Sequence, residues 1–360
     1  MSIPSTQLIQ FVQENPLPWL HYDEEIGRLV FTIDNYLLSS YRGCAQYFMR
    51  LALEGWHQKA ITGAPERNWA LDFGILFHKM MEVYYKTFRS EGFELQKFAI
   101  ETASKYWVEM KMDVHLTHKE CQQMGGYPGF AGMMIQYATQ FAAENEHLRV
   151  LATEVAFGKN KEVPIYVGLP YDDTISIYCA ADIYLSGRLD IIADDGFHII
   201  PLDHKTMGSF RGDPLMRFVN DDGPTGYIFA LNTILPHIVP SELILKRQCN
   251  MISMNLISKA VPKEGSRFKR LPLLKSTAQL EAYRQRVIGT CNNLLADLDS
   301  YVRGLGVPRD TSHCSNWYFR QCPYLDVCRQ ADKAGEEATL KNGFLKLPIW
   351  DTENVQGVED

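Results

Sequence analysis

The chain has 360 residues, of which 46% are hydrophobic and 22% are charged, and its formal net charge is −7. This is the composition of an ordinary globular protein with enough apolar material for a large core. The negative net charge excludes a protein that binds nucleic acid through an overall basic surface. A local basic groove can still bind nucleic acid.

The first half of the sequence reads as helical. We expect residues 1–35, with Pro16 and Pro18, to form an irregular lead-in. Apolar residues then recur at helical spacing in a series of segments that follow the lead-in. These predicted helices cover residues 36–56, 69–92, 95–112 and 127–147.

From residue 148 the pattern changes to β-branched and aromatic runs broken by Gly, Asp and Pro. Such runs predict the strands of one mostly antiparallel sheet, with a tight turn at Asp194-Asp195-Gly196. The predicted strands cover residues 148–159, 165–171, 175–194, 196–206 and 242–258. Helices are expected at 224–235 and 276–305, the second opened by Ser276 or Thr277. The order of elements predicts an α/β or α+β fold around a central sheet.

No apolar run is long enough to span a bilayer, and the N-terminus lacks the charged and apolar regions of a secretory signal. We therefore expect a cytoplasmic protein without a membrane partner. The eight cysteines should then be free thiols or metal ligands rather than disulfides.

One strand end carries the residues of a hydrolytic site. In the stretch PLDHKT, Asp203 and Lys205 project from the same face of a strand, and His204 projects from the other. A hairpin can bring Asp190 opposite Asp203. Two close carboxylates have raised pKa values unless a cation joins them, and Mg²⁺ takes oxygen ligands and keeps waters that can act as nucleophiles. A bare D-x-K is more often a solvated ion pair, but here it follows the apolar run IIPL.

At this point the sequence resembles the PD-(D/E)XK nucleases, in the RecB-like branch that includes the AddB and CRISPR-adaptation nucleases and many phage exonucleases. The resemblance rests on an ordered series of short motifs over residues 36–330. These are SSYRGC, GILFH, ATEVAF, GRLD, LDHKT and CSNWYFRQCPYLDVC. The resemblance implies a restriction-endonuclease-like core, with a mixed central sheet flanked by helices, a helical N-terminal portion and a Cys-bearing C-terminal tail.

The resemblance also implies roles for individual residues. His78, Asp190 and Asp203 would bind a catalytic Mg²⁺ or Mn²⁺, with the backbone carbonyl of His204 as a further ligand. Lys205 would position or activate the attacking water. Glu154 would be an outer-shell ligand, a ligand to a second metal, or a partner to a basic residue.

The chain departs from the family pattern in the helix after the lysine. Many members carry Q-x-x-x-Y there, and Tyr227 matches the tyrosine while Gly223 stands at the glutamine position. Tyr227 would contact the substrate phosphate, or it is a half-buried helix tyrosine. The missing glutamine puts substrate positioning in doubt, but it leaves the metal site intact.

Four cysteines match the family members that hold a [4Fe–4S] cluster, namely Cys44, Cys314, Cys322 and Cys328. Thiolates suit such a cluster, which would tie the C-terminal tail to the first helix. The spacing between Cys322 and Cys328 fits the family, whereas seven residues between Cys314 and Cys322 replace the usual two. Zinc or plain structural thiols remain alternatives. The other cysteines are expected to be ordinary buried residues.

We therefore expect a nuclease domain at 36–330, divided into a helical part (36–147), a catalytic core (148–260) and a C-terminal helix with the cysteine cluster (276–330), followed by a tail at 331–360. The expected function is metal-dependent hydrolysis of DNA, by exonuclease action in recombination, repair or phage DNA metabolism, with a helicase or recombination partner in a bacterial or phage-infected cell. The alternatives are an inactive DNA-binding or scaffold module of the same fold and a hydrolase for another substrate. The predicted phosphate contacts are Lys246, Arg247, Lys269 and Arg270, and a solvated basic face is the alternative for this cluster.

Overall fold

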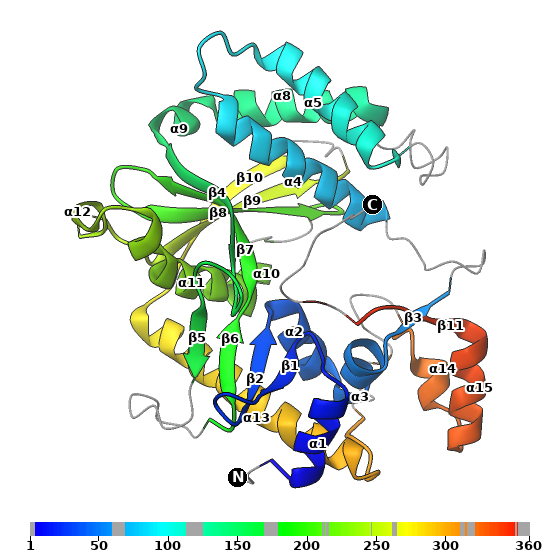
Figure 1. Cartoon of the computed structure of the whole chain (residues 1–360). Coiled ribbons are helices and arrows are strands. Elements are labelled where there is room, and N and C mark those ends of the chain that lie inside the picture. The colour runs from blue at the N-terminus through cyan, green and yellow to red at the C-terminus, as the bar shows by residue number, and fades with distance from the viewer. Residues whose placement is uncertain are drawn as a thin grey trace. The chain divides into compact units, whose positions relative to one another are not determined.

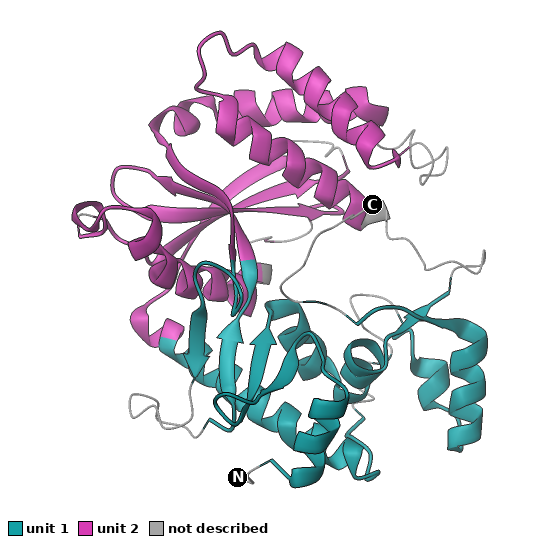
Figure 2. Cartoon of the chain, in the orientation of Figure 1, with its two compact units in different colours: residues 1–67, 157–187, 281–355 teal, residues 68–156, 188–280, 356–360 magenta. Residues whose placement is uncertain are grey.

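Two larger β-sheets organise the chain, and each belongs to a different unit of the computed structural model (Figures 1 and 2). Unit 1 contains residues 1–67, 157–187 and 281–355, and unit 2 contains residues 68–156 and 188–280. The structure describes residues 4–59, 69–112, 125–168, 179–210, 213, 216–245, 247–260, 265–309, 314, 321–349 and 351. No helix within these ranges has the length and apolar character needed to cross a membrane.

The sheet of unit 2 has five strands in the order β10-β9-β8-β7-β4 and is mixed. β7 and β8 form an antiparallel hairpin, β8 and β9 run parallel, and β9 and β10 are again antiparallel. Its strands are β4 (Arg149–Phe157), β7 (Gly187–Asp194), β8 (Ile199–Met207), β9 (Met251–Ser258) and β10 (Phe268–Leu274). The mixed central sheet that the sequence predicted is thus confirmed.

Helices cover both faces of this sheet (Figure 1). On one face, α4, α5 and α8 pack a large aromatic and methionine-rich core against Ile191, Ile200, Leu202 and Ile257 of the strands. On the other face, α11 packs against Ile252, Met254 and Leu256. The helices of unit 2 are α4 (Trp69–Thr87), α5 (Leu95–Glu109), α8 (Gly126–Gln140), α9 (Ala142–His147), α10 (Met216–Val219), α11 (Asp222–Ile238) and α12 (Ser241–Ile244).

Unit 1 contains a four-stranded sheet in the order β1-β2-β6-β5, with a parallel pair at its centre. The long helix α13 packs close to β5, where a Cβ on Gly168 would meet Ile288 at 2.9 Å. The remaining elements of unit 1 are α1 (Thr6–Glu14), β1 (Leu20–Asp23), β2 (Arg28–Ile33), α2 (Asn35–Gly43), α3 (Ala45–Phe48), the π-helix η1 (Met49–Leu53), β3 (Trp56–Gln58), β5 (Ile165–Gly168), β6 (Asp182–Leu185), α13 (Thr277–Val302), α14 (Leu325–Cys328), α15 (Lys333–Gly343) and β11 (Phe344–Lys346).

The ends of these elements are specified locally. Asp34 accepts a hydrogen bond from the backbone N–H of Leu37 at the start of α2. At the start of α13, Ser276 and Gln279 cap each other reciprocally. The turn between β7 and β8 uses Asp194 and Asp195, whose carboxylates accept backbone N–H groups, and it lies where the sequence placed it.

Four expectations differ from the structure. The lead-in at 1–35 is not irregular, because Ser5 caps α1 and the strands β1 and β2 follow. The stretches 165–171 and 175–185 contribute β5 and β6 to the sheet of unit 1 instead of joining the catalytic strands, and residues 169–178 lie outside the described ranges. The tail at 331–360 contains α15 and β11. The two discontinuous units also do not coincide with the contiguous parts expected from the sequence.

Candidate active site

The β7–β8 hairpin brings two acidic residues to the same strand end. Its register pairs Ile191 with Leu202, and one further step places Asp190 opposite Asp203. At this point the backbone N–H of His204 donates to Oδ2 of Asp190 at 2.9 Å. The expected juxtaposition of the two aspartates is therefore present.

Helix α4 supplies the histidine. Gly74 faces β8 so closely that a Cβ there would lie 3.2 Å from Oγ1 of Thr206. One turn later, Nδ1 of His78 lies 3.2 Å from Oδ2 of Asp190. The G-x-x-x-H motif thus has a physical basis, because the glycine allows the helix to approach the strand and the histidine then reaches the carboxylate.

Lys205 and Tyr227 complete the group on the side of α11. The ammonium of Lys205 donates to Oδ1 of Asp203 at 2.9 Å and lies 5.6 Å from the centroid of the Tyr227 ring. The Asp203 side chain is buried at 4% exposure, whereas Lys205 is 39% exposed. The second carboxylate oxygen of Asp203, Oδ2, is buried and has no hydrogen-bond donor.

The two aspartates differ in charge preference. Burial alone would raise the pKa of Asp190, but His78 and His204 outweigh it and hold that pKa well below its usual range. Burial raises the pKa of Asp203 to about 6, against the opposing effect of Lys205 and with a further contribution from Asp190. Burial opposes the charge of Lys205, but Asp203 keeps the pKa of Lys205 above its usual value. Such opposed shifts at one place are typical of functional sites.

Glu154 has the basic partner that one of its three expected roles requires. Its Oε2 lies 2.7 Å from Nε of Arg188, and burial raises the pKa of Glu154 to about 7 while Arg188 lowers it. Glu154 also has a φ of 53°, a left-handed backbone conformation that a residue other than glycine adopts at an energetic cost. The backbone of β4 is therefore distorted at Glu154.

The donor set fits a hard divalent cation. The buried Oδ2 of Asp203, which lacks a donor, lies beside a second carboxylate and a histidine. Carboxylate oxygens are the ligands that Mg²⁺ prefers. Within the described ranges, however, no three His, Cys, Asp or Glu side chains have the spacing of a formed metal site. Binding would therefore require His78 and Asp190, which now contact each other, to adjust.

The predicted phosphate contacts fall in different environments. Lys269 is exposed, with its ammonium 5.1 Å from the Phe210 ring centroid. Arg247 is bound by Asp194 at 2.8 Å, and Lys246 lies outside the described residues. Arg270 differs from the expectation, since its side chain is 9% exposed and donates to internal oxygens. A phosphate contact was expected here, but Tyr137 of α8 and its neighbours enclose the guanidinium.

Two residues that contact His204 were not predicted as site residues from the sequence. The hydroxyl of Tyr137 lies 3.2 Å from Nε2 of His204, and the amide nitrogen of Asn255 lies 3.4 Å from the same atom. A signal was present for Asn255, which is a polar residue inside the apolar strand MISMNLIS. Arg188, the partner of Glu154, stands two residues before Asp190 in the quoted motif GRLD.

The four cysteines of the second predicted site lie near one another in unit 1. The backbone N–H of Cys322 donates to the carbonyl of Cys314 at 2.8 Å. Burial raises the pKa of the Cys322 thiol to about 11, and the thiols of Cys314, Cys328 and Cys44 raise it further. All four are free thiols and are not yet at metal-ligand spacing. Of the other cysteines, Cys179 and Cys291 are buried as expected, Cys249 is half-buried, and Cys121 lies outside the described residues.

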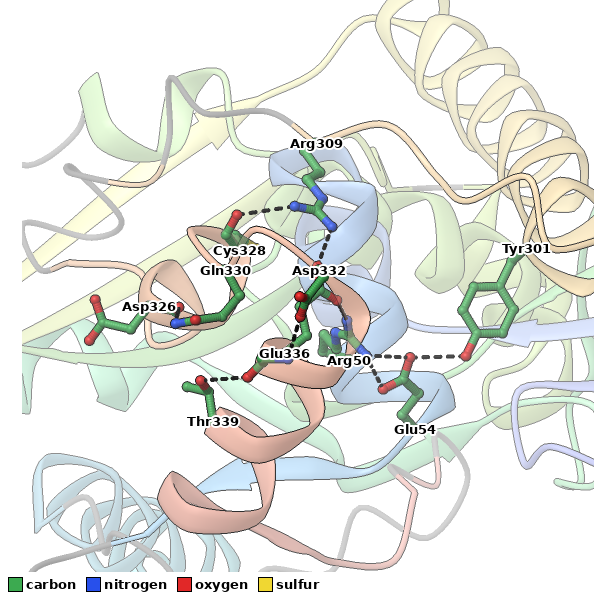
Figure 3. Close-up of polar contacts among 11 residues, drawn as sticks. Arg50, Glu54, Tyr301, Arg309, Asp326, Cys328, Gln330, Asp332, Glu336 and Thr339 are labelled. Atoms are coloured by element: carbon green, nitrogen blue, oxygen red, sulfur yellow. Dashed lines mark hydrogen bonds and ion pairs between the residues drawn. The ribbon is translucent and has the colours of Figure 1, made fainter.

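A charged network holds the C-terminal helix beside these cysteines (Figure 3). Arg50 donates to Glu54 at 2.7 Å and to Glu336 of α15 at 2.6 Å. Arg309 donates to the other oxygen of Glu336 at 2.5 Å and to the backbone carbonyl of Cys328 at 3.0 Å. Glu336 is 12% exposed, so this carboxylate is a mostly buried link between the tail and the first helices.

Comparison with known proteins gives one informative match. The family model described as the PD-(D/E)XK nuclease superfamily matches residues 37–329. A search of curated proteins finds no match. Among solved structures, one described as "Crystal structure of SSO0001" aligns with 62% of this chain and 86% of its own at 12% identity, with a TM-score of 0.26.

Proposed function

The chain belongs to the PD-(D/E)XK nuclease superfamily, and on this premise we propose that it hydrolyses DNA phosphodiester bonds with Mg²⁺ or Mn²⁺. The observation that carries the proposal is the convergence of Asp190, Asp203 and Lys205 at one strand end, with a buried oxygen of Asp203 that lacks a donor. Exonuclease action in recombination, repair or phage DNA metabolism is the mode we propose, with a helicase or recombination partner in the cytoplasm.

Each residue has a distinct task in this proposal. His78, Asp190, Asp203 and the backbone carbonyl of His204 would hold the metal ion. When bound, the ion supplies charge for the phosphate and lowers the pKa of a bound water. The ammonium of Lys205 orients the attacking water beside Asp203. Tyr227 and the exposed Lys269 position the phosphate, and Glu154 holds Arg188 near the same site.

The experiment is DNA cleavage by the full chain with Mg²⁺, Mn²⁺ or EDTA, for wild type, Asp203→Asn and Lys205→Ala. The matched control is Asp195→Asn, the same substitution at the turn of the same hairpin. We expect cleavage to fall by roughly 10²-fold or more in the two site variants, the size of effect seen when a catalytic proton or charge contact is lost, and to persist in the control. Metal-independent cleavage, or equal activity in all four proteins, would refute the proposal.

An inactive DNA-binding module is the second candidate function, favoured by the absence of the family's glutamine at Gly223. It predicts salt-sensitive DNA binding without cleavage by the wild type. The same assay therefore separates the two functions.

We also propose that Cys44, Cys314, Cys322 and Cys328 hold a [4Fe–4S] cluster, supported by the mutual proximity of the four thiols. Protein purified without oxygen should show iron and visible absorption. Cys328→Ser should lose both, whereas Cys249→Ser, in unit 2, should retain them. Zinc or no metal in the wild-type protein would refute the assignment.

A further inference from the structure

Three buried polar side chains form a row across the sheet of unit 2. The strand register pairs His204 of β8 with Asn255 of β9, and Asn255 in turn with Arg270 of β10. His204 is 1% exposed and Asn255 is 0% exposed. Burying such groups costs free energy unless each finds a partner, so the contacts of this row indicate what it does.

Arg270 fixes one end of the row. Its Nε donates to Oδ1 of Asn255 at 2.8 Å, and its other nitrogens donate to Asn145 at 3.0 Å, Tyr85 at 2.9 Å and Tyr137 at 3.1 Å. A guanidinium only donates hydrogen bonds. The carbonyl oxygen of Asn255 must therefore face Arg270, and its NH₂ group faces His204.

This arrangement assigns the hydrogen on the His204 ring. Nε2 of His204 lies 3.4 Å from the NH₂ group of Asn255, which only donates, and 3.2 Å from the hydroxyl of Tyr137, which already accepts from Arg270. Nε2 is therefore the acceptor, and the ring hydrogen is on Nδ1.

Nδ1 of His204 faces Asp190 across 3.6 Å. The same carboxylate oxygen, Oδ2, accepts the backbone N–H of His204 at 2.9 Å and lies 3.2 Å from Nδ1 of His78. The backbone N–H of His204 and the ring of His78 thus reach one oxygen of Asp190, while the buried Nδ1 of His204, which has no hydrogen-bond partner, faces the same oxygen from just beyond hydrogen-bond distance. All three of these contacts are made to Oδ2, so none of them uses Oδ1, the second oxygen of Asp190.

We propose that the imidazole of His204 is a positioning residue that sets the orientation of the metal-binding carboxylate of Asp190, and that Arg270 acts on it through Asn255. This inference rests on the proposed metal-dependent function. It gives the middle residue of the D-x-K motif a task for its side chain, on the face of the sheet opposite Asp203 and Lys205.

The test is Mn²⁺ binding to the full chain without DNA, measured by the loss of the free Mn²⁺ resonance. Two variants distinguish the roles of the two ring nitrogens of His204. His204→Asn keeps an amide near the position of Nδ1, whereas His204→Gln keeps an acceptor near Nε2 and loses the nitrogen that faces Asp190. Tyr85→Phe is the control, because it removes a hydroxyl bound by Arg270 that is not hydrogen-bonded to His204.

We expect His204→Gln to weaken Mn²⁺ binding by about 10-fold or more, the usual effect of losing a residue that orients a metal ligand. His204→Asn should stay within about 3-fold of wild type, and Tyr85→Phe should lower the unfolding midpoint without changing Mn²⁺ affinity. Equal weakening by Asn and Gln, unchanged binding in His204→Gln, or no Mn²⁺ binding by wild type would overturn the inference.

A second measurement does not depend on how well the variants fold. In the wild-type protein labelled with ¹⁵N on its histidine rings, His204 should show a protonated Nδ1 and a bare Nε2. A protonated Nε2 with a bare Nδ1 would overturn the inference. If the wild type binds Mn²⁺ but cleaves no DNA, the proposed function fails. The ratio of the Mn²⁺ affinities of wild type and His204→Gln then still decides the role of His204.

Discussion

Replacing Arg270 with methionine should destabilise the protein rather than weaken DNA binding. Methionine keeps much of the aliphatic volume and removes every donor of the guanidinium. Asn145 and Asn255, which are 1% and 0% exposed, then lose the donor to their side-chain oxygens. Leaving a buried acceptor without its donor costs about 1–3 kcal/mol for each group. Because domains are stable by only about 5–15 kcal/mol, the loss should be visible in any unfolding experiment.

The assay is urea unfolding followed by circular dichroism, beside DNA binding at several salt concentrations. Lys269→Met is the matched control, because Lys269 precedes Arg270 on the same strand and its side chain is exposed. We expect Lys269→Met to unfold within about 0.5 kcal/mol of wild type and to reduce the salt dependence of DNA binding by roughly one phosphate contact. Wild-type stability in Arg270→Met, with weaker and less salt-dependent DNA binding, would show that Arg270 faces the nucleic acid.

Two further predictions concern charged groups away from the active site. Glu336→Gln should destabilise the chain by about 2 kcal/mol in urea unfolding, because Arg50 and Arg309 lose their shared carboxylate; no change would mean that the ion pairs are solvated. Burial would raise the pKa of Asp194, but its bonds to Arg247 and a backbone N–H lower it, so Asp194 contributes stability above about pH 4 that is lost as the pH falls through the depressed pKa. Asp194→Asn should therefore be less stable than wild type at pH 7, with a difference that shrinks toward pH 3.5; a constant difference would contradict this.

Local patterns predicted the elements well but not their assignment to sheets. The Asp and Gly residues at 194–196 specified the hairpin, and the expected capping residue Ser276 marks a real helix start. The strand around Tyr184, however, joins β2 in unit 1, whereas the strand around Ile191 joins β8 in unit 2. Alternation of side chains determines which residues share a face, and it carries no information on the partner strand.

The active site was predictable where a motif ties residue type to strand position. Strand alternation put Asp203 and Lys205 on one face, and the structure has them in contact. The surroundings of His204 were not predictable, because Tyr137 comes from a helix and Asn255 from a strand that only the tertiary fold brings together. The predicted phosphate contact of Arg270 was wrong for the same reason, because a basic residue in a strand of mixed polarity does not indicate that a helix covers it.

The division of unit 1 into three separate segments bears on how the chain emerges from the ribosome. β2 pairs in parallel with β6, and Val30 meets Asp182. At roughly 5–20 residues per second, β2 waits on the order of ten seconds for its neighbour. α4, α5, α8 and β4 are all synthesised in that interval. An apolar strand with an unpaired edge invites pairing with other chains. The nascent protein should therefore depend on chaperones most strongly before β6 appears, and fragments that separate β2 from β6 should aggregate when expressed alone.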